Sequence, residues 1–395
     1  MTRIVGSWTR CQRSLRGLEA KVAIVVVAAL TCVVPTASAQ AQSYREILLH
    51  SFNSGTDGSN PMAPLVLDTA GNLYGTTYGG GANSRGTIFR VDTTSSESVL
   101  YSFASGADGQ NPSAGLILVG SELYGTTEAG GTSGYGTVFE VSTSGQETIL
   151  YSFQGGADGS YPSGGLIRDS AGNLYGATTS GGASGDGTVF KIAGSGVETL
   201  LHRFSGGVDG EFPQGGLTGD ASLNLYGTTQ AGGASGWGTV FRVSTAGSEA
   251  VLYSFPDEES PNGVIRDSVG NSYGTTALGG ASGAGTVFKI ASSGKKTILH
   301  SFRGGSDGEY PSAGLIRDSA GNLYGTTYSG GTSNWGTVFR IDAKGHETVL
   351  YSFAAGSDGA SPVAGLVRDS SGNLYGTTKY GGAYGAGVVF KLELQ

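Results

Sequence analysis

The sequence predicts an all-β protein, a seven-bladed β-propeller with four antiparallel strands in each blade. Three observations support this prediction. A motif built around a Tyr-Gly pair recurs seven times, at steps of 47 to 51 residues. Each copy contains enough short β-type segments for the four strands of one propeller blade. The copies are also offset along the chain in a way that allows the ring to close.

The tyrosines of this motif give the repeat its register. They are Tyr74, Tyr124, Tyr175, Tyr226, Tyr273, Tyr324 and Tyr375. From each tyrosine to the phenylalanine of the following "GTVF"-type segment is always 15 residues, and from there to the next "YSF"-type phenylalanine is always 14. Only the stretch between that phenylalanine and the next Tyr-Gly pair varies in length. A β-solenoid is disfavoured, because its coils repeat over shorter distances.

One copy shows the four strands in order. "GLIRD" at 314–318 is strand a, and "LYGTT" at 323–327 is strand b, with a glycine in the turn between them. "TVFRI" at 337–341 is strand c, and "TVLYSF" at 348–353 is strand d. β-Branched and aromatic residues dominate these segments, and several are apolar on both faces. Such strands suit sheets that are covered on both sides.

The two ends of the repeat region favour a closed ring. A lone strand d, "EILLHSF" at 46–52, comes first, and the chain finishes on strand c at 387–395. The first strand can therefore complete the last blade, which removes both free sheet edges.

Residues 1–39 are predicted to be a secretory signal peptide, followed by the propeller at 40–395. A basic start precedes an apolar run at 22–34, and small residues at 37–39 offer a cleavage site, with 39–41 as a second option. An uncleaved membrane anchor is the alternative. Both cysteines, Cys11 and Cys32, fall in this segment, so the exported chain has no disulfide.

Export also changes the charge of the protein. The full chain carries −8, and removal of five basic residues and one acidic residue leaves about −12. Nucleic acids and anionic membranes bind clustered Lys and Arg, so both are excluded as partners. We expect a secreted monomer, extracellular or periplasmic, with no membrane insertion after cleavage.

The repeat "GLIRDSAGNLYGTTYSGGTSNWGTVFRID" at 314–342 resembles the GloVer (Gloeo/Verruco) tandem repeat of exported bacterial proteins. The resemblance covers about residues 46–392. More distantly, "D-x-x-G-N-L-Y" resembles the first hairpin of NHL-type propeller repeats. The family implies an exported repeat protein but no activity for named residues. Its members are often tethered by a C-terminal sorting segment; this chain ends on a strand at Gln395, and we expect it to be released.

Residues that occur in every copy are expected to be structural. His50, His202 and His300 replace the tyrosine of strand d, and His346 lies in a turn between strands c and d, so no catalytic histidine is expected. The aspartates of the "GxDG" loops and those that open the turn between strands a and b fit turn chemistry. A ring of calcium sites is the alternative, but calcium requires six to eight oxygen ligands. No metal, cofactor or catalytic residue is predicted.

Arginines end strand a in four blades: Arg168, Arg266, Arg317 and Arg368. They could form an axial ring for an anion, but pairing with aspartates at the rim of the ring is the favoured interpretation.

The candidate site is formed by two variable loop positions that open on the same face of a propeller. One, in the loop between strands b and c, holds Arg85, Tyr135, Asp186, Trp237, Ala284, Trp335 and Ala386. The other, in the loop between strands d and a, holds Asn60, Asn111, Tyr161, Phe212, Tyr310 and Ser361. The predicted ligand-binding residues are the aromatic ones: Tyr135, Trp237, Trp335, Tyr161, Phe212 and Tyr310. The alternative is that these rings pack on neighbouring loops.

The sequence therefore predicts a secreted binding or scaffold protein that recognises extracellular carbohydrate or a protein through this face. The alternative is a polysaccharide lyase or hydrolase with its site at the propeller axis. An enzyme is expected to break the sevenfold repeat with acid and base residues at the channel mouth.

Overall fold

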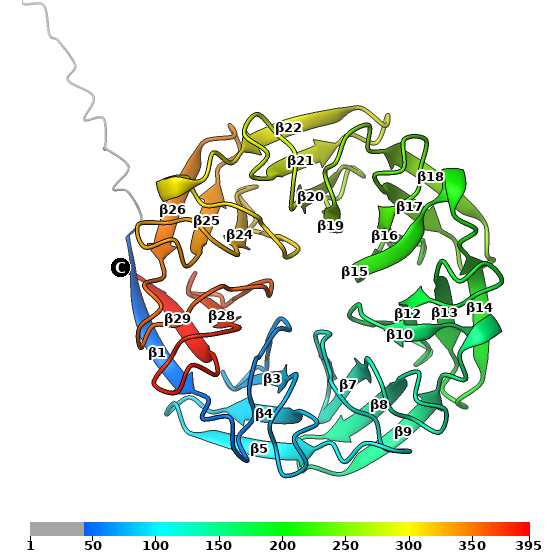
Figure 1. Cartoon of the computed structure of the whole chain (residues 1–395), viewed down its shortest axis with the longest axis horizontal. Helices are drawn as coiled ribbons and strands as arrows, with labels where there is room; N and C mark the ends of the chain where they lie inside the picture. Colours follow the sequence, from blue (N-terminus) through cyan, green and yellow to red (C-terminus); the bar gives the residue numbers. More distant parts are fainter. Residues whose placement is uncertain (1–42) are drawn as a thin grey trace, which may run out of the picture. The chain divides into compact units, whose positions relative to one another are not determined.

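The computed structural model describes residues 43–395, which form seven antiparallel sheets arranged as blades around a central axis (Figure 1). The predicted seven-bladed propeller is confirmed. The predicted signal peptide at 1–39 lies outside the described residues.

The strands are named here by their layer, counted from the axis outward. The innermost layer, strand a, consists of β2 (Val66–Leu67), β6 (Ile117–Val119), β11 (Ile167–Arg168), β15 (Glu211–Gly219), β19 (Pro261–Arg266), β23 (Ile316–Arg317) and β27 (Val367–Arg368). Strand b consists of β3 (Leu73–Thr77), β7 (Glu122–Thr127), β12 (Leu174–Ser180), β16 (Leu225–Ala231), β20 (Ser272–Thr276), β24 (Leu323–Thr327) and β28 (Leu374–Thr378). Strand c consists of β4 (Thr87–Val91), β8 (Thr137–Ser142), β13 (Thr188–Ile192), β17 (Thr239–Val243), β21 (Thr286–Ile290), β25 (Thr337–Ile341) and β29 (Val388–Leu394). The outermost layer, strand d, consists of β5 (Glu97–Ser102), β9 (Glu147–Ser152), β14 (Glu198–Arg203), β18 (Glu249–Ser254), β22 (Lys296–Ser301), β26 (Glu347–Ser352) and β1 (Tyr44–Ser51).

A few short elements complete this pattern. Blade 3 carries an additional inner strand, β10 (Ser160–Pro162), which pairs with β12. Three of the loops between strands d and a contain a single 3-10 turn: η1 (Gly156–Asp158), η2 (Gly207–Asp209) and η3 (Gly305–Asp307).

The blades are numbered along the chain, and the last one closes the ring. Blade 1 is β2–β5, blade 2 is β6–β9, blade 3 is β10–β14, blade 4 is β15–β18, blade 5 is β19–β22 and blade 6 is β23–β26. Blade 7 combines β27, β28 and β29 with β1, which runs beside β29 in Figure 1. The pairing extends from Tyr44 opposite Leu394 to Ser51 opposite Val388. The predicted closure is confirmed, and it leaves neither end of the ring with an unpaired edge.

Strand a is shorter than predicted in most blades. In blade 6 it covers Ile316–Arg317 instead of 314–318. The blades converge toward the axis, and the backbones of neighbouring blades approach each other closely there: a Cβ atom on Gly164 would lie 2.2 Å from the carbonyl oxygen of Gly215. The segment before strand a therefore lines the axis as loop, and only its end pairs with strand b.

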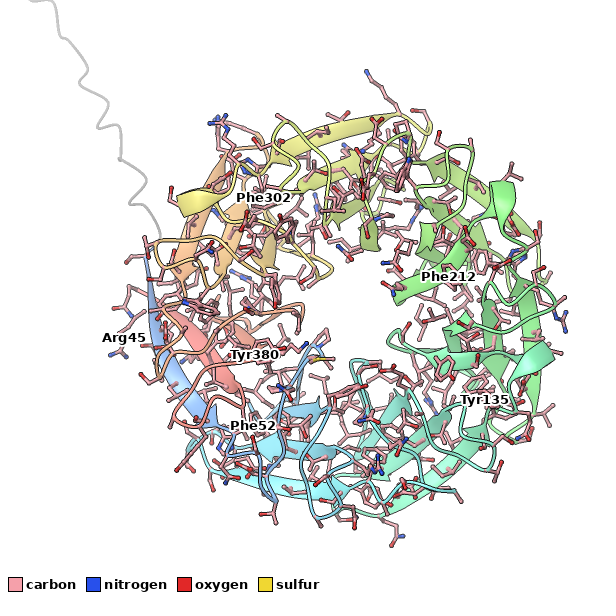
Figure 2. The ribbon with its side chains drawn as sticks, in the orientation of Figure 1. Arg45, Phe52, Tyr135, Phe212, Phe302 and Tyr380 are labelled. Atoms are coloured by element: carbon pink, nitrogen blue, oxygen red, sulfur yellow. The ribbon has the colours of Figure 1, made fainter. Side chains whose placement is uncertain are left out.

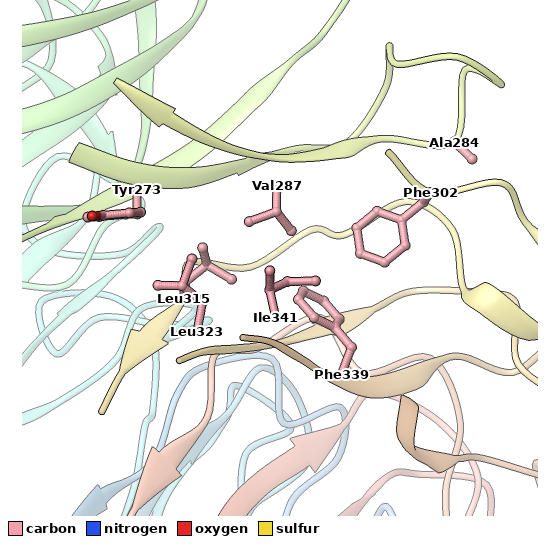
Figure 3. Close-up of a cluster of buried hydrophobic side chains, with 8 residues drawn as sticks. All are labelled: Tyr273, Ala284, Val287, Phe302, Leu315, Leu323, Phe339 and Ile341. Carbon is pink, nitrogen blue, oxygen red and sulfur yellow. The ribbon is translucent and has the colours of Figure 1, made fainter. Parts of the chain in front are cut away.

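The hydrophobic core lies between successive blades. In the cluster of Figure 3, Phe302 of blade 5 and Phe339 of blade 6 meet edge to face, with ring centroids 5.1 Å apart, and Val287 and Leu315 are buried beside them. The Tyr-Gly motif follows from this packing, because a Cβ atom on Gly325 would lie 2.6 Å from Cζ of Phe339. Each such phenylalanine contributes about 1.5–3 kcal/mol on burial.

The aspartate that opens the turn between strands a and b stabilises that turn. In blade 4, Asp220 accepts hydrogen bonds from the backbone N–H and Nδ2 of Asn224, at 3.0 and 2.9 Å, and from the Tyr226 hydroxyl at 2.8 Å. Burial raises the pKa of Asp220, but these hydrogen bonds outweigh it and hold the pKa at about 2. These aspartates have the turn role that we expected.

The arginines that end strand a contact aromatic rings of the preceding blade. The guanidinium of Arg266 lies 3.7 Å from the ring centroid of Tyr226, and Arg168 lies 5.3 Å from that of Tyr124. Arg317 and Arg368 repeat this contact in the following blades. These stacking contacts tie one blade to the next. The sequence predicts that these arginines pair with aspartates at the rim of the ring. Their main contacts are instead these aromatic rings.

A ring of charged side chains lies on the outer side of the blade junctions. At six junctions a glutamate in the first half of strand d has its pKa raised by burial and, in addition, by the negative charge of the "GxDG" aspartate of the preceding blade. These pairs are Glu97 with Asp57, Glu147 with Asp108, Glu198 with Asp158, Glu249 with Asp209, Glu347 with Asp307, and Glu46 with Asp358. Between blades 4 and 5, Lys296 forms an ion pair with Glu259 instead.

Candidate functional site

The two variable loop positions meet at each blade junction and are joined by a third residue. We call the three residues a junction triplet: an outer residue from the loop between strands b and c, a middle residue from the next loop between strands d and a, and an inner residue four positions after the tyrosine of the next Tyr-Gly pair. Starting from the junction between blades 7 and 1, the triplets are Ala386/Asn60/Tyr78, Arg85/Asn111/Glu128, Tyr135/Tyr161/Thr179, Asp186/Phe212/Gln230, Trp237/Ser260/Ala277, Ala284/Tyr310/Tyr328 and Trp335/Ser361/Lys379.

Backbone hydrogen bonds hold the members of a triplet together. The N–H of Tyr161 donates to the carbonyl of Tyr135 across the junction at 3.0 Å, and Phe212 donates to Asp186 in the same way at 2.9 Å. Within the following blade, the N–H of Tyr328 donates to the carbonyl of Tyr310 at 3.1 Å. The two loop positions that the sequence singles out are therefore neighbours in space, and their backbones are held in place.

The middle residue of every triplet has a left-handed backbone conformation, with φ between 50° and 58°. Asparagine is well suited to this conformation. Asn60 and Asn111 also use their side chains structurally, since Nδ2 donates to the carbonyl of the preceding inner residue, Lys379 at 3.1 Å or Tyr78 at 2.9 Å.

Three other triplets place a bulky aromatic residue at this strained middle position: Tyr161, Phe212 and Tyr310. A bulky side chain with positive φ is an outlier that costs about 1–3 kcal/mol. The tyrosines are 41% and 40% exposed, so burial of the ring does not explain the choice. The aromatic residues therefore occupy positions where asparagine is the simpler structural solution.

The junction between blades 2 and 3 forms a preorganised aromatic pair. The rings of Tyr135 and Tyr161 meet edge to face with centroids 6.0 Å apart. Tyr135 also lies against Gly155, where a Cβ atom would come within 2.6 Å of the tyrosine ring. Part of this surface thus packs on a neighbouring loop, as the alternative interpretation held, yet both rings stay exposed. Figure 2 shows Tyr135 and Phe212 on neighbouring stretches of the ring.

The two tryptophans are exposed members of the predicted site. Trp237 is 40% exposed and Trp335 is 46% exposed, and each is the outer residue of its triplet. Their middle partners, Ser260 and Ser361, are small. Neither tryptophan therefore has a large middle side chain next to it in its triplet.

The inner residues were not singled out from the sequence. They form the third variable position, directly after the "YGTT" segment: Tyr78, Glu128, Thr179, Gln230, Ala277, Tyr328 and Lys379. Their variability next to a constant motif is a signal that could have identified them. Burial raises the pKa of Glu128, partly offset by a hydrogen bond from Tyr78. Glu128 is thus a partly buried acid at a single junction.

An open channel runs along the axis, and Figure 2 shows side chains leaving the centre of the ring free. It has a volume of about 420 Å³ and is lined by strand a and the segments that precede it. The lining side chains are uncharged, and the polar ones are those of Ser113, Ser163, Gln214, Thr218, Asn262 and Ser312. The arginines of strand a are not part of it, so the considered axial anion ring is not formed.

The histidines and the loop aspartates pair with each other away from the axis. His50 Nε2 lies 3.2 Å from Oδ2 of Asp57, and Tyr101 donates to Asp108 at 2.8 Å in the next blade. The same aspartates accept backbone N–H groups, as Asp158 does from Gln154 at 2.8 Å. Among residues 43–395 there is no group of three or more His, Cys, Asp and Glu that could hold a metal. In the same range, no helix is long and apolar enough to cross a membrane.

The fold and the repeated triplets define a propeller built from seven near-identical sequence repeats. The chain belongs to the Gloeobacter/Verrucomicrobia repeat family, whose model matches residues 38–236 and 223–395. The resemblance noted in the sequence is confirmed. No curated protein matches the chain.

Several solved structures share the propeller fold at low sequence identity. A streptogramin B lyase has a TM-score of 0.61 at 15% identity, over 89% of this chain and 98% of its own. Virginiamycin B lyase from Staphylococcus aureus, as a catalytically inactive histidine-to-alanine variant with quinupristin, has a TM-score of 0.63 at 13% identity, over 90% and 100%. The extracellular domain of a candidate hybrid two-component system from B. thetaiotaomicron has a TM-score of 0.59 at 11% sequence identity. The match covers 89% of this chain and 40% of that chain. These likenesses establish the fold alone.

Proposed function

We propose that this protein is an exported binding protein whose aromatic junction triplets recognise extracellular carbohydrate. One observation carries the proposal: exposed tyrosine, with phenylalanine at an equivalent position, occupies the strained middle place of triplets where asparagine serves the fold elsewhere. Strain that the fold does not require points to a role in function.

The geometry of the triplets suits sugar binding. Tyr135, Trp237 and Trp335 are exposed at alternate junctions, between blades 2 and 3, 4 and 5, and 6 and 7, and a sugar ring stacks its C–H groups on the faces of such rings. The glycine-rich loops around them leave room for close approach of a ligand. The triplet backbones are fixed by hydrogen bonds, so binding orders few additional groups.

A protein partner is the second possible occupant of this face, since exposed tyrosine and tryptophan are also typical anchors of protein interfaces. Export is supported by the basic and apolar N-terminal segment, and one structural neighbour is an extracellular domain. The net charge of about −12 after loss of residues 1–39 remains the argument against nucleic acid.

A second candidate function is catalysis on a polysaccharide, with an acid at the junction between blades 1 and 2. Glu128 favours it, because this acid is partly buried, is hydrogen-bonded by Tyr78 and is the only carboxylate among the inner residues of the described triplets. The neighbouring lyase depends on a histidine, whereas His50, His202 and His300 of this chain lie on strand d. Its reaction is therefore not transferred.

The first experiment follows retardation of the purified protein by a panel of polysaccharides in affinity electrophoresis. We expect one glycan class to retard it, and Trp237→Ala with Trp335→Ala to abolish the effect. Val269→Ala is the matched control, because Val269 is 71% exposed in a turn between strands a and b, on the opposite face. A protein that no glycan retards contradicts the proposal.

The same panel separates binding from catalysis. Release of new reducing or unsaturated ends, lost in Glu128→Gln, supports the enzyme. Retardation without any product supports the binding protein.

A further inference from the structure

Aromatic residues are distributed unevenly among the triplets. Five junctions carry an aromatic residue in the outer or middle place, starting with the junction between blades 2 and 3 and ending with the junction between blades 6 and 7. The two junctions that flank blade 1 carry none in these places. Since the blades follow chain order around the ring, these five junctions are consecutive. We call this surface the aromatic arc, defined by Tyr135, Tyr161, Phe212, Trp237, Tyr310 and Trp335.

The charged residues at the outer and middle places of the arc, and directly before its middle places, are acidic. Asp186 is the outer residue next to Phe212, and Glu211 and Glu309 directly precede Phe212 and Tyr310. The carboxylates of Asp186 and Glu211 both face Gly206, since a Cβ atom there would lie 3.2 Å and 4.0 Å from their oxygens. Glu309 accepts a hydrogen bond from Ser329 at 3.0 Å. None of the three takes part in the ion pairs found among the described residues.

Basic residues of the triplets lie at or beyond the ends of the arc. Arg85 belongs to the junction between blades 1 and 2, outside the arc. Lys379 is an inner residue at its far end, with Nζ 5.1 Å from the ring centroid of Tyr380. An acidic polymer laid on the arc would therefore meet carboxylates that form no ion pair, which disfavours it. Sugar hydroxyls, in contrast, can donate hydrogen bonds to these carboxylates.

We infer that the ligand is an uncharged polysaccharide chain, bound lengthwise over several junctions of the arc, and that the face rejects uronate-rich or sulfated glycans. This inference rests on the proposed function and adds the charge and the length of the ligand. Each triplet is a shallow platform that binds weakly by itself. A chain that reaches several platforms gains affinity because its later contacts form within one complex.

The test measures affinities of the purified protein by calorimetry at low ionic strength. The probes are disaccharides and hexasaccharides from neutral glucans, mannans and xylans, and the corresponding lengths of polygalacturonate and alginate. We expect a neutral hexasaccharide to bind about 10²-fold more tightly than its disaccharide, and the uronates not to bind.

Matched variants test the charge argument. Asp186→Asn, Glu211→Gln and Glu309→Gln keep the size of the side chains and remove the charges, and together they are expected to admit the uronate hexasaccharides. Arg85→Ala, outside the arc, is expected to leave neutral binding unchanged.

The possible failures are distinct. Uronates that bind the unaltered protein as tightly as neutral chains, or affinity that does not depend on length, overturn this inference and leave carbohydrate binding standing. If no glycan of either kind binds, both this inference and the proposed function fail.

Discussion

The junction between blades 4 and 5 differs from the other six on the outer side of the ring. At the six, the charge of an aspartate in the preceding loop acts on a glutamate of strand d, and one glutamate oxygen is buried without a hydrogen-bond partner. At the exceptional junction the loop is four residues shorter, and Lys296 pairs with Glu259. The side chains of this pair are only 9% and 7% exposed.

Both arrangements solve the same electrostatic problem in different ways. Two carboxylates that face each other at a half-buried site cannot both ionise cheaply. Burial, reinforced by the charge of Asp57, raises the pKa of Glu97 to about 7, and four of the other glutamates behave alike. A proton neutralises these junctions, whereas the ammonium group of Lys296 neutralises the seventh. The comparison predicts that the protonation of a glutamate makes the stability of the six junctions depend on pH, whereas the seventh has no such glutamate.

The largest expected effect is on the pH dependence of the whole ring. A glutamate whose pKa is higher in the folded than in the unfolded protein stabilises the fold below about pH 4.5, and this stabilisation is lost as the pH rises through about 7. We expect a loss of about 1 kcal/mol per glutamate after solvent screening at these half-exposed sites. Melting temperatures at pH 5 and pH 8, at equal ionic strength, measure the total.

Two histidines act in the opposite direction over this range. Burial lowers the pKa of His50 and of His202, so their contribution is lost as the pH falls. The two histidines stabilise the protein as the pH rises, whereas the six glutamates destabilise it. Because the glutamates outnumber the histidines, the protein should still melt at a lower temperature at pH 8 than at pH 5. Equal or higher stability at pH 8 contradicts the account.

Breaking the exceptional junction is expected to have the next largest effect. Lys296→Met leaves Glu259 as a buried carboxylate without its partner, and we expect a loss of about 3–5 kcal/mol. Part of that loss comes from the contact of the ammonium with the Phe255 ring, whose centroid is 4.7 Å away. Urea unfolding at pH 7 measures it, and a loss below about 1 kcal/mol shows that the pair is not the neutralising element.

The matched change at an ordinary junction should have a small effect of opposite sign. Glu97→Gln removes a carboxylate that faces Asp57, and we expect a gain of about 1 kcal/mol at pH 8 and little change at pH 5. Urea unfolding at the two pH values provides the measurement. A loss of stability at pH 8 indicates that the ionised glutamate is required.

The junctions also differ on the binding face, where the smallest effect is expected for Tyr161→Asn. Tyr161→Asn places the favoured residue at a left-handed position, and it should change stability by less than about 1 kcal/mol, because relief of strain offsets the lost Tyr135 contact. Glycan retardation should nevertheless weaken. The reverse change, Asn111→Tyr, should cost about 1–3 kcal/mol, since strain is added and the hydrogen bond to Tyr78 is lost. Thermal unfolding of both variants tests the pair.

Much of the fold could be predicted because strands b and c are determined by local patterns. β24 and β25 have the predicted bounds, 323–327 and 337–341. Strand a is shorter than its apolar pattern suggests, because crowding at the axis, absent from any single repeat, prevents its first residues from pairing. The main contact of Arg266 was also missed, because its aromatic partner, Tyr226, belongs to the preceding blade.

The candidate site could be predicted only in part. The aromatic positions were visible as breaks in a regular repeat, but their status as binding residues remains a prediction. Their grouping into triplets was not visible, since Tyr135 and Tyr161 belong to different repeats and are joined by a hydrogen bond across a junction. The left-handed backbone of Tyr161 was hidden as well, because the residue type argues against it.

The sequence by itself determined the number of blades, the closure of the ring and the positions that vary. These features depend on strand periodicity and on spacing along the chain, which local residue patterns encode. The tertiary structure alone decided which variable residues share a junction, which carboxylates face each other and which groups line the channel. Those relations depend on how each blade packs against the next, and that packing brings together residues that lie in different repeats.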